Sequence, residues 1–359
     1  MTAFIKEINP AEIESCGSAD LFLQSDFWGE FKGSFGWTTL PFNVQWFDDS
    51  KTALLVLCQR LAPGISFAYI PWGPELPGNF PDNDDSKTKA LEELALLLKK
   101  YLPKSTAFLR IDAPWYNEGA DLISPVIGKP FITSSADIQP PDTVIINLSQ
   151  SEEEIIAAMK AKWRYNSRLA VNRGVKISRH DEDGLEIFYK LLKETSFRNG
   201  IALRSINYYK TLCEQCKKYS GSNNAKVEIR LYLAEHEGES IAGIFVLLWK
   251  NKATYLYGAS SNTKKNLMAP YALQVKAMLD AKASGCVEYD LFGIPPNDDP
   301  NHPMAGLYLF KTGFGGTIIH RPKSHDFVYR SFSAGAFRFA ESLRKKIRDS
   351  KKKKRKTAE

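Results

Sequence analysis

The chain of 359 residues has a length typical of about two domains, at roughly 150 residues each. Hydrophobic residues make up 43% and charged residues 25%, which excludes a wholly disordered protein, and the net charge is +7. No apolar run approaches the roughly 20 residues of a membrane-spanning helix, and the N-terminal segment lacks the apolar core of an export signal. We therefore expect a cytoplasmic location.

The expected elements occur in the same order in both halves of the chain. Alternating and continuous apolar runs predict strands, and the leucine spacing after residue 86 predicts an amphipathic helix. In the first half the order is strand 53–60, strand 67–71, helix 86–101 and strand 107–112. In the second half it is strand 240–249, strand 253–260, helix 270–284 and strand 287–291. Two β-β-α-β units predict a mixed α/β fold that arose by internal duplication.

The joint between the halves lies near a proline-rich segment at 139–142. We expect a first domain over 1–147 and a second over 148–322. The second should begin with a helix over 149–173, because Ser149 and Glu152 fit a capping box. Lys160, Arg164 and Arg168 follow one another at helical spacing in it, either as a solvated face or as a stripe facing an anion or RNA.

The C-terminal segment carries most of the positive charge. Residues 344–359 contain ten Lys or Arg and two acidic residues, so the rest of the chain is nearly neutral. We expect a helix over 323–350 to pack on the first domain and residues 351–359 to be disordered. The tail either aids solubility or is attracted to RNA or an anionic membrane. The apolar residues spaced for the docked face are Phe332, Ala336, Ala340, Leu343 and Ile347.

The cysteines and histidines indicate neither disulfides nor a metal site. Five cysteines without an export signal are expected to be free thiols. Cys213 and Cys216 form a lone C-x-x-C with no second pair or flanking histidines, so we interpret the spacing as a coincidence of helical periodicity.

The β-β-α-β unit resembles the GNAT acyltransferase architecture. Enzymes of that class that use acyl-CoA bind its pyrophosphate with a glycine-rich turn at the start of the helix. The matching segment here, residues 261–270, has no glycine, and Pro270 removes one backbone donor. CoA binding is therefore disfavoured.

A lysine inside an aromatic run is the sharpest local feature. Lys311 follows Tyr308 and Phe310 and precedes Phe314 in the sequence. A lysine in such surroundings is desolvated, so its charge acts at low effective dielectric and could stabilise an oxyanion or hold a phosphate. The alternative is a lysine whose head reaches solvent from an amphipathic segment.

Five segments in order resemble the Fem peptidyltransferase family (FemABX). They are residues 157–174 (AAMKAKWRYNSRLAVNRG), 255–260 (YLYGAS), 269–274 (APYALQ), 289–294 (YDLFGI) and 309–311 (LFK). The resemblance implies two tandem GNAT-like domains. It also implies transfer of an amino acid from aminoacyl-tRNA to the stem peptide of a peptidoglycan precursor, either UDP-MurNAc-pentapeptide or a lipid-linked form. No cofactor or metal is implied besides the aminoacyl-tRNA co-substrate.

The resemblance also assigns site residues. The family's catalytic Phe-Lys pair matches Phe310 and Lys311, and the lysine would stabilise the tetrahedral intermediate. Asp112 matches an acidic position suggested as a base. The precursor-binding positions match less closely: they are Lys32, Arg204, Tyr208 and Tyr257.

Val227 follows Glu182 by only 45 positions, too few for a coiled-coil arm in addition to two expected helices at 185–197 and 206–218. The chain therefore resembles the armless members. Two other functions stay open on the sequence. One is an acyl-CoA-dependent GNAT N-acyltransferase. The other is a non-catalytic protein that binds RNA or a membrane through the basic tail.

Overall fold

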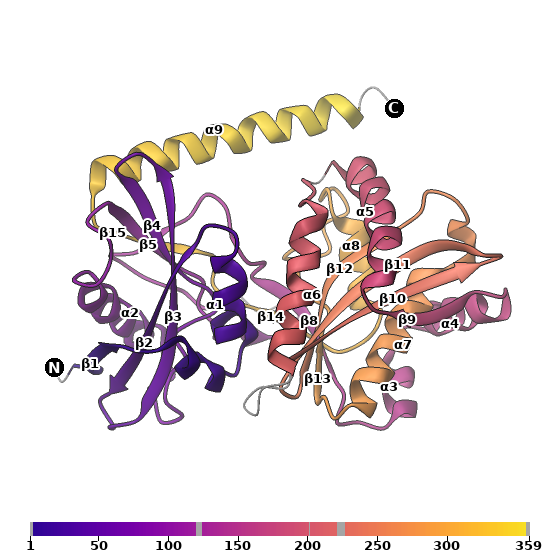
Figure 1. Ribbon diagram of the computed structural model, residues 1–359, viewed down its shortest axis with the longest axis horizontal. Helices are drawn as coiled ribbons and strands as arrows, with labels where there is room; N and C mark the ends of the chain where they lie inside the picture. The colour runs from indigo at the N-terminus through magenta and orange to yellow at the C-terminus, as the bar shows by residue number, and fades with distance from the viewer. Residues whose placement is uncertain (1–2, 120–123, 201, 221–226, 357–359) are drawn as a thin grey trace. The chain divides into compact units, whose positions relative to one another are not determined.

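The computed structural model describes residues 3–119, 124–200, 202–220 and 227–356. The chain divides into two compact units (Figure 1). The first comprises Met1–Asn117, Leu122–Pro141 and His320–Glu359, and the second comprises Glu118–Asp121 and Asp142–Ile319. In the part of the chain that is described, no helix combines the length and the apolar character that crossing a membrane requires.

The first unit has a mixed sheet whose described strands run in the order β1-β2-β3-β4-β5-β15-β7. The strands are β1 (Ile5–Pro10), β2 (Thr38–Trp46), β3 (Lys51–Ala62), β4 (Ile65–Ile70), β5 (Thr106–Ile111), β7 (Ile132–Thr133) and β15 (His325–Val328). The helices are α1 (Asp26–Gly33), α2 (Asp84–Leu98) and α9 (Ser331–Lys356). Leu91, Leu94 and Leu98 of α2 are fully buried and belong to the core of the unit.

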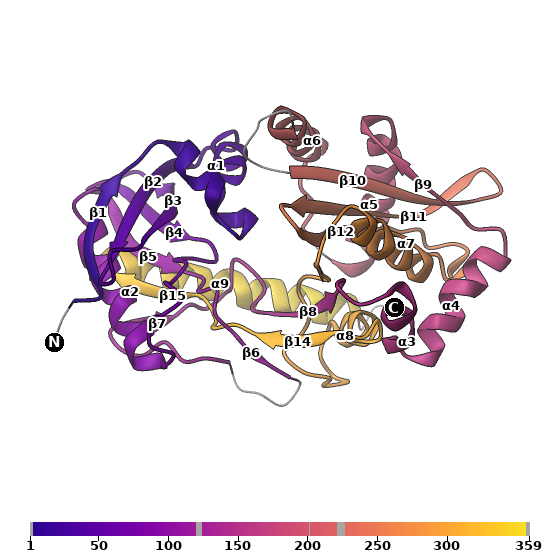
Figure 2. The same cartoon turned by 90° about the horizontal axis from the view of Figure 1, so that it is seen from below.

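The second unit has a sheet in the order β6-β14-β8-β13-β12-β11-β10-β9 over its described residues. The strands are β6 (Asn117–Glu118), β8 (Asp142–Asn147), β9 (Lys176–His180), β10 (Val227–His236), β11 (Glu239–Trp249), β12 (Lys252–Ser260), β13 (Glu288–Asp290) and β14 (Thr317–His320). The helices are α3 (Glu152–Ala158), α4 (Ala161–Asn172), α5 (Leu185–Asn199), α6 (Ile206–Ser220), α7 (Ala269–Ala283) and α8 (Ala305–Thr312). Figure 2 shows α6 and α7 on opposite sides of β10, β11 and β12.

The predicted repeat of the β-β-α-β order is confirmed by the strand pairing. In the first unit β2, β3 and β4 are antiparallel, α2 follows, and β5 then pairs with β4 in parallel. The second unit repeats this with β10, β11 and β12, then α7, then β13 parallel to β12. Each unit is thus GNAT-like. Between β9 and β10, the described residues form α5 and α6 of 15 residues each, so the described part of this region has no long arm.

The predicted domain limits need three corrections. Strand β8 pairs with β13, so the second unit begins at Asp142 and not at residue 148. The chain returns to the first unit at His320, β15 then pairs with β5 from His325 onward, and α9 begins at Ser331. The helix continues to Lys356, beyond the predicted start of disorder at 351, and residues 357–359 lie outside the described residues.

The helix predicted over 149–173 is two helices. Met159 and Lys160 have extended backbone, and the Lys160 N–H donates to the carbonyl of Gly313 at 2.9 Å instead of continuing the helix. The capping box at the start of α3 is formed by Ser151 and Glu154, not by Ser149 and Glu152. Because the Arg164 guanidinium donates to the carbonyls of Ala157 and Met159, it closes the end of α3 and is not a free member of a basic stripe.

The docked face of α9 also differs from the prediction. Ala334 is fully buried, and the Phe337 ring lies 5.2 Å from that of Phe108 and 6.3 Å from that of Phe67. On the predicted face, Phe332 is 92% exposed and Leu343 is 49% exposed. The helix does pack on the first unit, but it does so through Ala334 and Phe337, and Phe332 and Leu343 of the predicted face stay exposed.

Candidate functional site around Lys311

Lys311 lies in the last turn of α8 and is buried, with 6% of its surface exposed. Its Nζ donates to the carbonyl oxygens of Phe292 at 2.7 Å and Gly293 at 3.0 Å, and it lies 5.1 Å from the centre of the Tyr255 ring. The third N–H of the ammonium has no hydrogen-bond acceptor among the residues that the structure describes. The prediction of a desolvated lysine is therefore confirmed, and solvent exposure of its head is excluded.

Burial changes the acid strength of this group. It lowers the pKa of the Lys311 ammonium to about 7, against a smaller opposing effect from Asp290. A lysine with such a pKa exchanges its proton near neutral pH. In a dry site its charge also acts more strongly on a nearby oxyanion than it would in water, which suits stabilisation of an acyl-transfer intermediate.

Phe310 and its neighbours hold α8 in place. The Phe310 carbonyl accepts a hydrogen bond from Nε1 of Trp163 at 2.8 Å, and its ring contacts Tyr271 edge-on at 5.2 Å. Gly313 leaves room for the indole, because a Cβ there would lie 2.1 Å from a Trp163 ring atom. Trp163 lies in the segment 157–174 that resembles the Fem family, where no role was predicted for it. A tryptophan within that segment is the signal that could have identified it as a positioning residue.

A bulge in β12 turns two tyrosines to opposite faces of the sheet. Tyr257 pairs with Phe245 and Tyr255 with Val246, so Leu256 is the extra residue. Tyr255 packs with the core on the α7 side and contacts Lys311. Tyr257 lies on the α6 side, where its ring is 5.2 Å from that of Tyr209. Lys311 therefore lies on the α7 side of the sheet, beside Tyr255, whereas Tyr257 lies on the α6 side.

The predicted precursor-binding residues of the second unit form one cluster. The Tyr257 hydroxyl lies 3.5 Å from that of Tyr208, and the exposed Arg204 guanidinium lies 5.5 Å from the Tyr208 ring. Burial raises the pKa of Tyr208, so its hydroxyl stays a neutral donor. A cation beside two neutral hydroxyls suits a diphosphate and a sugar. The binding role of these residues stays a prediction.

The two predicted residues of the first unit are linked by aromatic rings. The half-buried Lys32 in α1 lies with its Nζ 5.0 Å from the Trp37 ring centre, and that ring is 6.2 Å from Tyr69. The Tyr69 hydroxyl donates to Oδ2 of Asp112 at 2.5 Å. Lys32 and Asp112 therefore belong to one continuous set of contacts.

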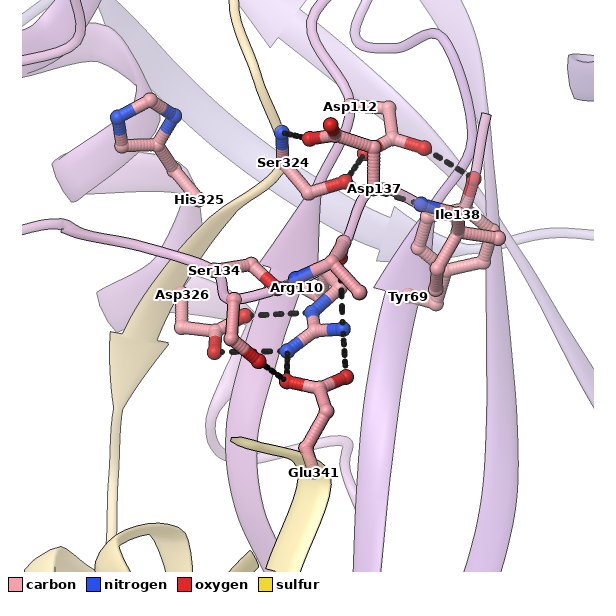
Figure 3. Close-up of polar contacts among 12 residues, drawn as sticks. Tyr69, Arg110, Asp112, Ser134, Asp137, Ile138, Ser324, His325, Asp326 and Glu341 are labelled. Carbon is pink, nitrogen blue, oxygen red and sulfur yellow. Dashed lines mark hydrogen bonds and ion pairs between the residues drawn. The ribbon is translucent and has the colours of Figure 1, made fainter. Parts of the chain in front are cut away.

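Asp112 is 4% exposed and accepts three hydrogen bonds, and Figure 3 shows those from Tyr69 and Ser324. The donors are the hydroxyls of Tyr69 and Ser324 and the backbone N–H of Gln139. Burial raises its pKa to about 6, against the effect of these hydrogen bonds. These contacts tie β5 to the segments that precede β8 and β15. No sequence pattern indicates this positioning role, and the role of Asp112 as a base stays a prediction.

In the segment 261–270, where an acyl-CoA enzyme would bind the pyrophosphate, two backbone N–H groups already donate to side chains of the protein. The N–H of Asn262 donates to the carboxylate of Glu194 at 3.2 Å, and that of Thr263 donates to the Ser261 hydroxyl at 3.2 Å. A carboxylate at this position repels phosphate, which agrees with the expectation from the missing glycine.

The second unit also has a cavity of about 460 Å³ between α6, β9 and β10. Arg179, Glu228 and the buried thiols of Cys213 and Cys216 line it, and none of the predicted site residues does. Burial raises the pKa of Cys213 to about 12, so it is an inert thiol. All five cysteines are free, as predicted.

Comparisons with known proteins place this geometry in a family. A sequence model of the FemAB family matches residues 131–240 and 217–342, more than half of the chain. The Staphylococcus epidermidis protein named lipid II:glycine glycyltransferase is 25% identical over 245 residues, a match that covers 53% of this chain and only 59% of that protein. A protein of the same name from Staphylococcus saprophyticus is 24% identical over 394 residues, with 92% of each chain covered.

A solved structure shares the fold. The crystal structure of FemX matches with a TM-score of 0.74 and 18% sequence identity, covering 92% of this chain and all of that one. Together with the family match, this agrees with the resemblance noted from the five ordered segments. The chain belongs to the FemAB family.

Proposed function

We propose that the chain is an aminoacyltransferase that adds an amino acid from aminoacyl-tRNA to the stem peptide of a peptidoglycan precursor. The observation that carries the proposal is Lys311, a buried ammonium held by two carbonyls over the Tyr255 ring in a chain of the FemAB family. Relatives named as glycyltransferases that act on lipid II support the same class of reaction. Since aminoacyl-tRNA is made in the cytoplasm, we place the reaction there.

The proposed chemistry is ester aminolysis. The acceptor amine attacks the ester carbonyl of the aminoacyl-tRNA and forms a C–N bond. The tetrahedral oxyanion is stabilised by the Lys311 ammonium, whose third N–H is directed to no acceptor among the described residues. The C–O bond then breaks, and the proton lost by the amine is taken up by the departing ribose oxygen of the tRNA. Bonds and charges balance without a cofactor.

The acceptor would be held by the precursor-binding residues predicted above. Within the second unit, Arg204 with Tyr208 and Tyr257 offers a cation and two neutral hydroxyls, of which that of Tyr257 donates to that of Tyr208. In the first unit, Lys32 is a further cation predicted to bind the precursor. Such a set suits the diphosphate that UDP-linked and lipid-linked precursors share, so these residues do not distinguish the two acceptors.

The test is label transfer by the full chain. Radiolabelled aminoacyl-tRNA is supplied with UDP-MurNAc-pentapeptide or with the lipid-linked precursor, and in parallel labelled acetyl-CoA replaces the tRNA. We expect transfer from tRNA to at least one acceptor and none from the thioester. Transfer from acetyl-CoA alone would assign the chain to the GNAT N-acyltransferases. No transfer from any tRNA pool to either acceptor would overturn the proposal.

A further inference from the structure

Helix α9 is fixed to the first unit along one face. The Arg110 guanidinium, which is buried in β5, donates to Asp326 at 2.7 Å and to Glu341 of α9 at 3.0 Å (Figure 3). The Ser135 hydroxyl adds a hydrogen bond to Glu341 at 2.6 Å, and the Phe337 ring packs at a tilt against that of Phe108. Because both a buried ion pair and a ring contact hold this face, the rotation of α9 about its own axis is determined.

That rotation leaves an apolar stripe on the opposite side. Phe332 is 92% exposed, Phe339 is 74% exposed and Leu343 is 49% exposed. They are seven and four residues apart, about two turns and then about one turn, so they lie along one line of the helix. Burying the two phenylalanine rings would be favourable, because it would remove apolar surface from water. A line of exposed apolar side chains of this size therefore indicates an interaction surface.

The same helix continues directly into the basic segment. Between residues 344 and 356 the sequence has ten Lys or Arg and one acidic residue, Asp349. A helix with an aromatic stripe and a strongly cationic sequence is the pattern of helices that lie in the interface of an anionic bilayer. We propose that α9 binds the surface of an anionic phospholipid membrane and inserts Phe332, Phe339 and Leu343 among the lipids.

The exposed rings decide between lipid and RNA. Both offer the negative charge that the basic segment attracts, but a folded RNA has no apolar layer that would take up a line of three apolar side chains. A bilayer surface provides both, with anionic headgroups above an apolar interior. A second copy of α9 is disfavoured because its own basic segment would repel the first.

The experiment is co-sedimentation of the full chain with vesicles, with no transfer reaction involved. One set of vesicles is phosphatidylcholine, and the other is phosphatidylcholine and phosphatidylglycerol in equal amounts. The test variant combines Phe332→Ser with Phe339→Ser. The matched control is Phe197→Ser in α5, a phenylalanine that is 79% exposed in the other unit. Gel-shift titration with total tRNA is run on the same proteins.

We expect binding to the mixed vesicles only, weaker by about tenfold or more in the double variant and unchanged in Phe197→Ser. Thermal unfolding should be the same for all three proteins, since the substituted rings are exposed. Absence of binding to mixed vesicles would overturn the proposal. Equal binding by wild type and double variant would do so too, as would tRNA binding without vesicle binding.

Discussion

The ammonium of Lys311 lies 5.1 Å from the centre of the Tyr255 ring and donates to two backbone carbonyls. In the described part of the chain, no carboxylate lies within ion-pair distance of it. The charge is thus stabilised by dipoles and an aromatic face, which solvate it less well than water does. That deficit accounts for the lowered pKa and leaves the cation available to an oxyanion.

Replacing Lys311 by Met should stabilise the fold while it abolishes the proposed reaction. A side chain of similar length without the buried charge removes a desolvation cost, so the free energy of unfolding should rise by about 1–4 kcal/mol at neutral pH. The folded pKa of about 7 lies below the ordinary 10.5, so the folded state binds fewer protons between these values. The wild type therefore gains stability as pH rises from 7, and the advantage of the variant shrinks. Urea unfolding at several pH values measures both effects, and a variant less stable at neutral pH would argue against a strained ammonium.

The pH dependence of turnover should reflect the same group. If the protonated Lys311 stabilises the oxyanion, kcat should decline as pH rises through about 7. The opposing trend comes from the acceptor amine, which must lose its proton to attack. The rate of label transfer, corrected for spontaneous ester hydrolysis, is the measurement. A rate that climbs steadily from pH 6 to 9 would exclude a role for the ammonium form.

Arg110 should carry much of the stability of the first unit. Arg110→Met would leave Asp326, whose side chain is 1% exposed, as a buried charge without its partner, at a cost of about 3–5 kcal/mol. Glu341→Gln should cost only about 1 kcal/mol, because this side chain is 17% exposed and its amide still accepts a hydrogen bond. Denaturant unfolding compares the two variants. Equal stability of Arg110→Met and wild type would contradict the importance of this ion pair.

The Arg204 and Tyr257 cluster should affect binding of the precursor and not the chemical step. Arg204→Ala should raise KM for the precursor roughly tenfold, as expected for loss of a charge-assisted hydrogen bond, with kcat nearly unchanged. The control is Arg168→Ala, an exposed arginine of α4 outside the cluster. Steady-state kinetics with varied precursor separate the two parameters. A fall in kcat at constant KM would move Arg204 from binding to chemistry.

Local patterns explain why the repeated β-β-α-β order could be predicted. The apolar run 240–249 and the short turn after it mark a hairpin through neighbouring residues alone, and Pro270 marks the start of α7. The break between α3 and α4 at Met159 and Lys160 could not be predicted in this way, because the sequence there has neither Pro nor Gly. It depends on contacts of Lys160 and Trp163 with Gly313 and Phe310, about 150 residues away in the chain.

Long-range contacts also decided the rotation of α9 and the surroundings of Lys311. The spacing of Phe332 and Leu343 identified an apolar face but not its partner, and the Arg110–Glu341 ion pair selects another face for docking. Burial of Lys311 could be predicted from the aromatic residues beside it in sequence. The Tyr255 ring and the carbonyl acceptors come from β12 and from the loop after β13, so they became visible only in the fold.

Single-turnover transfer from labelled aminoacyl-tRNA to the precursor by Lys311→Met tests the central claim most directly. Lys162→Met, an exposed lysine of α4, is the matched control. The account predicts that Lys311→Met, still folded and still binding precursor, transfers label at least about a hundredfold more slowly, while Lys162→Met matches the wild type. A Lys311→Met protein that transfers label at a rate close to that of the wild type would contradict it.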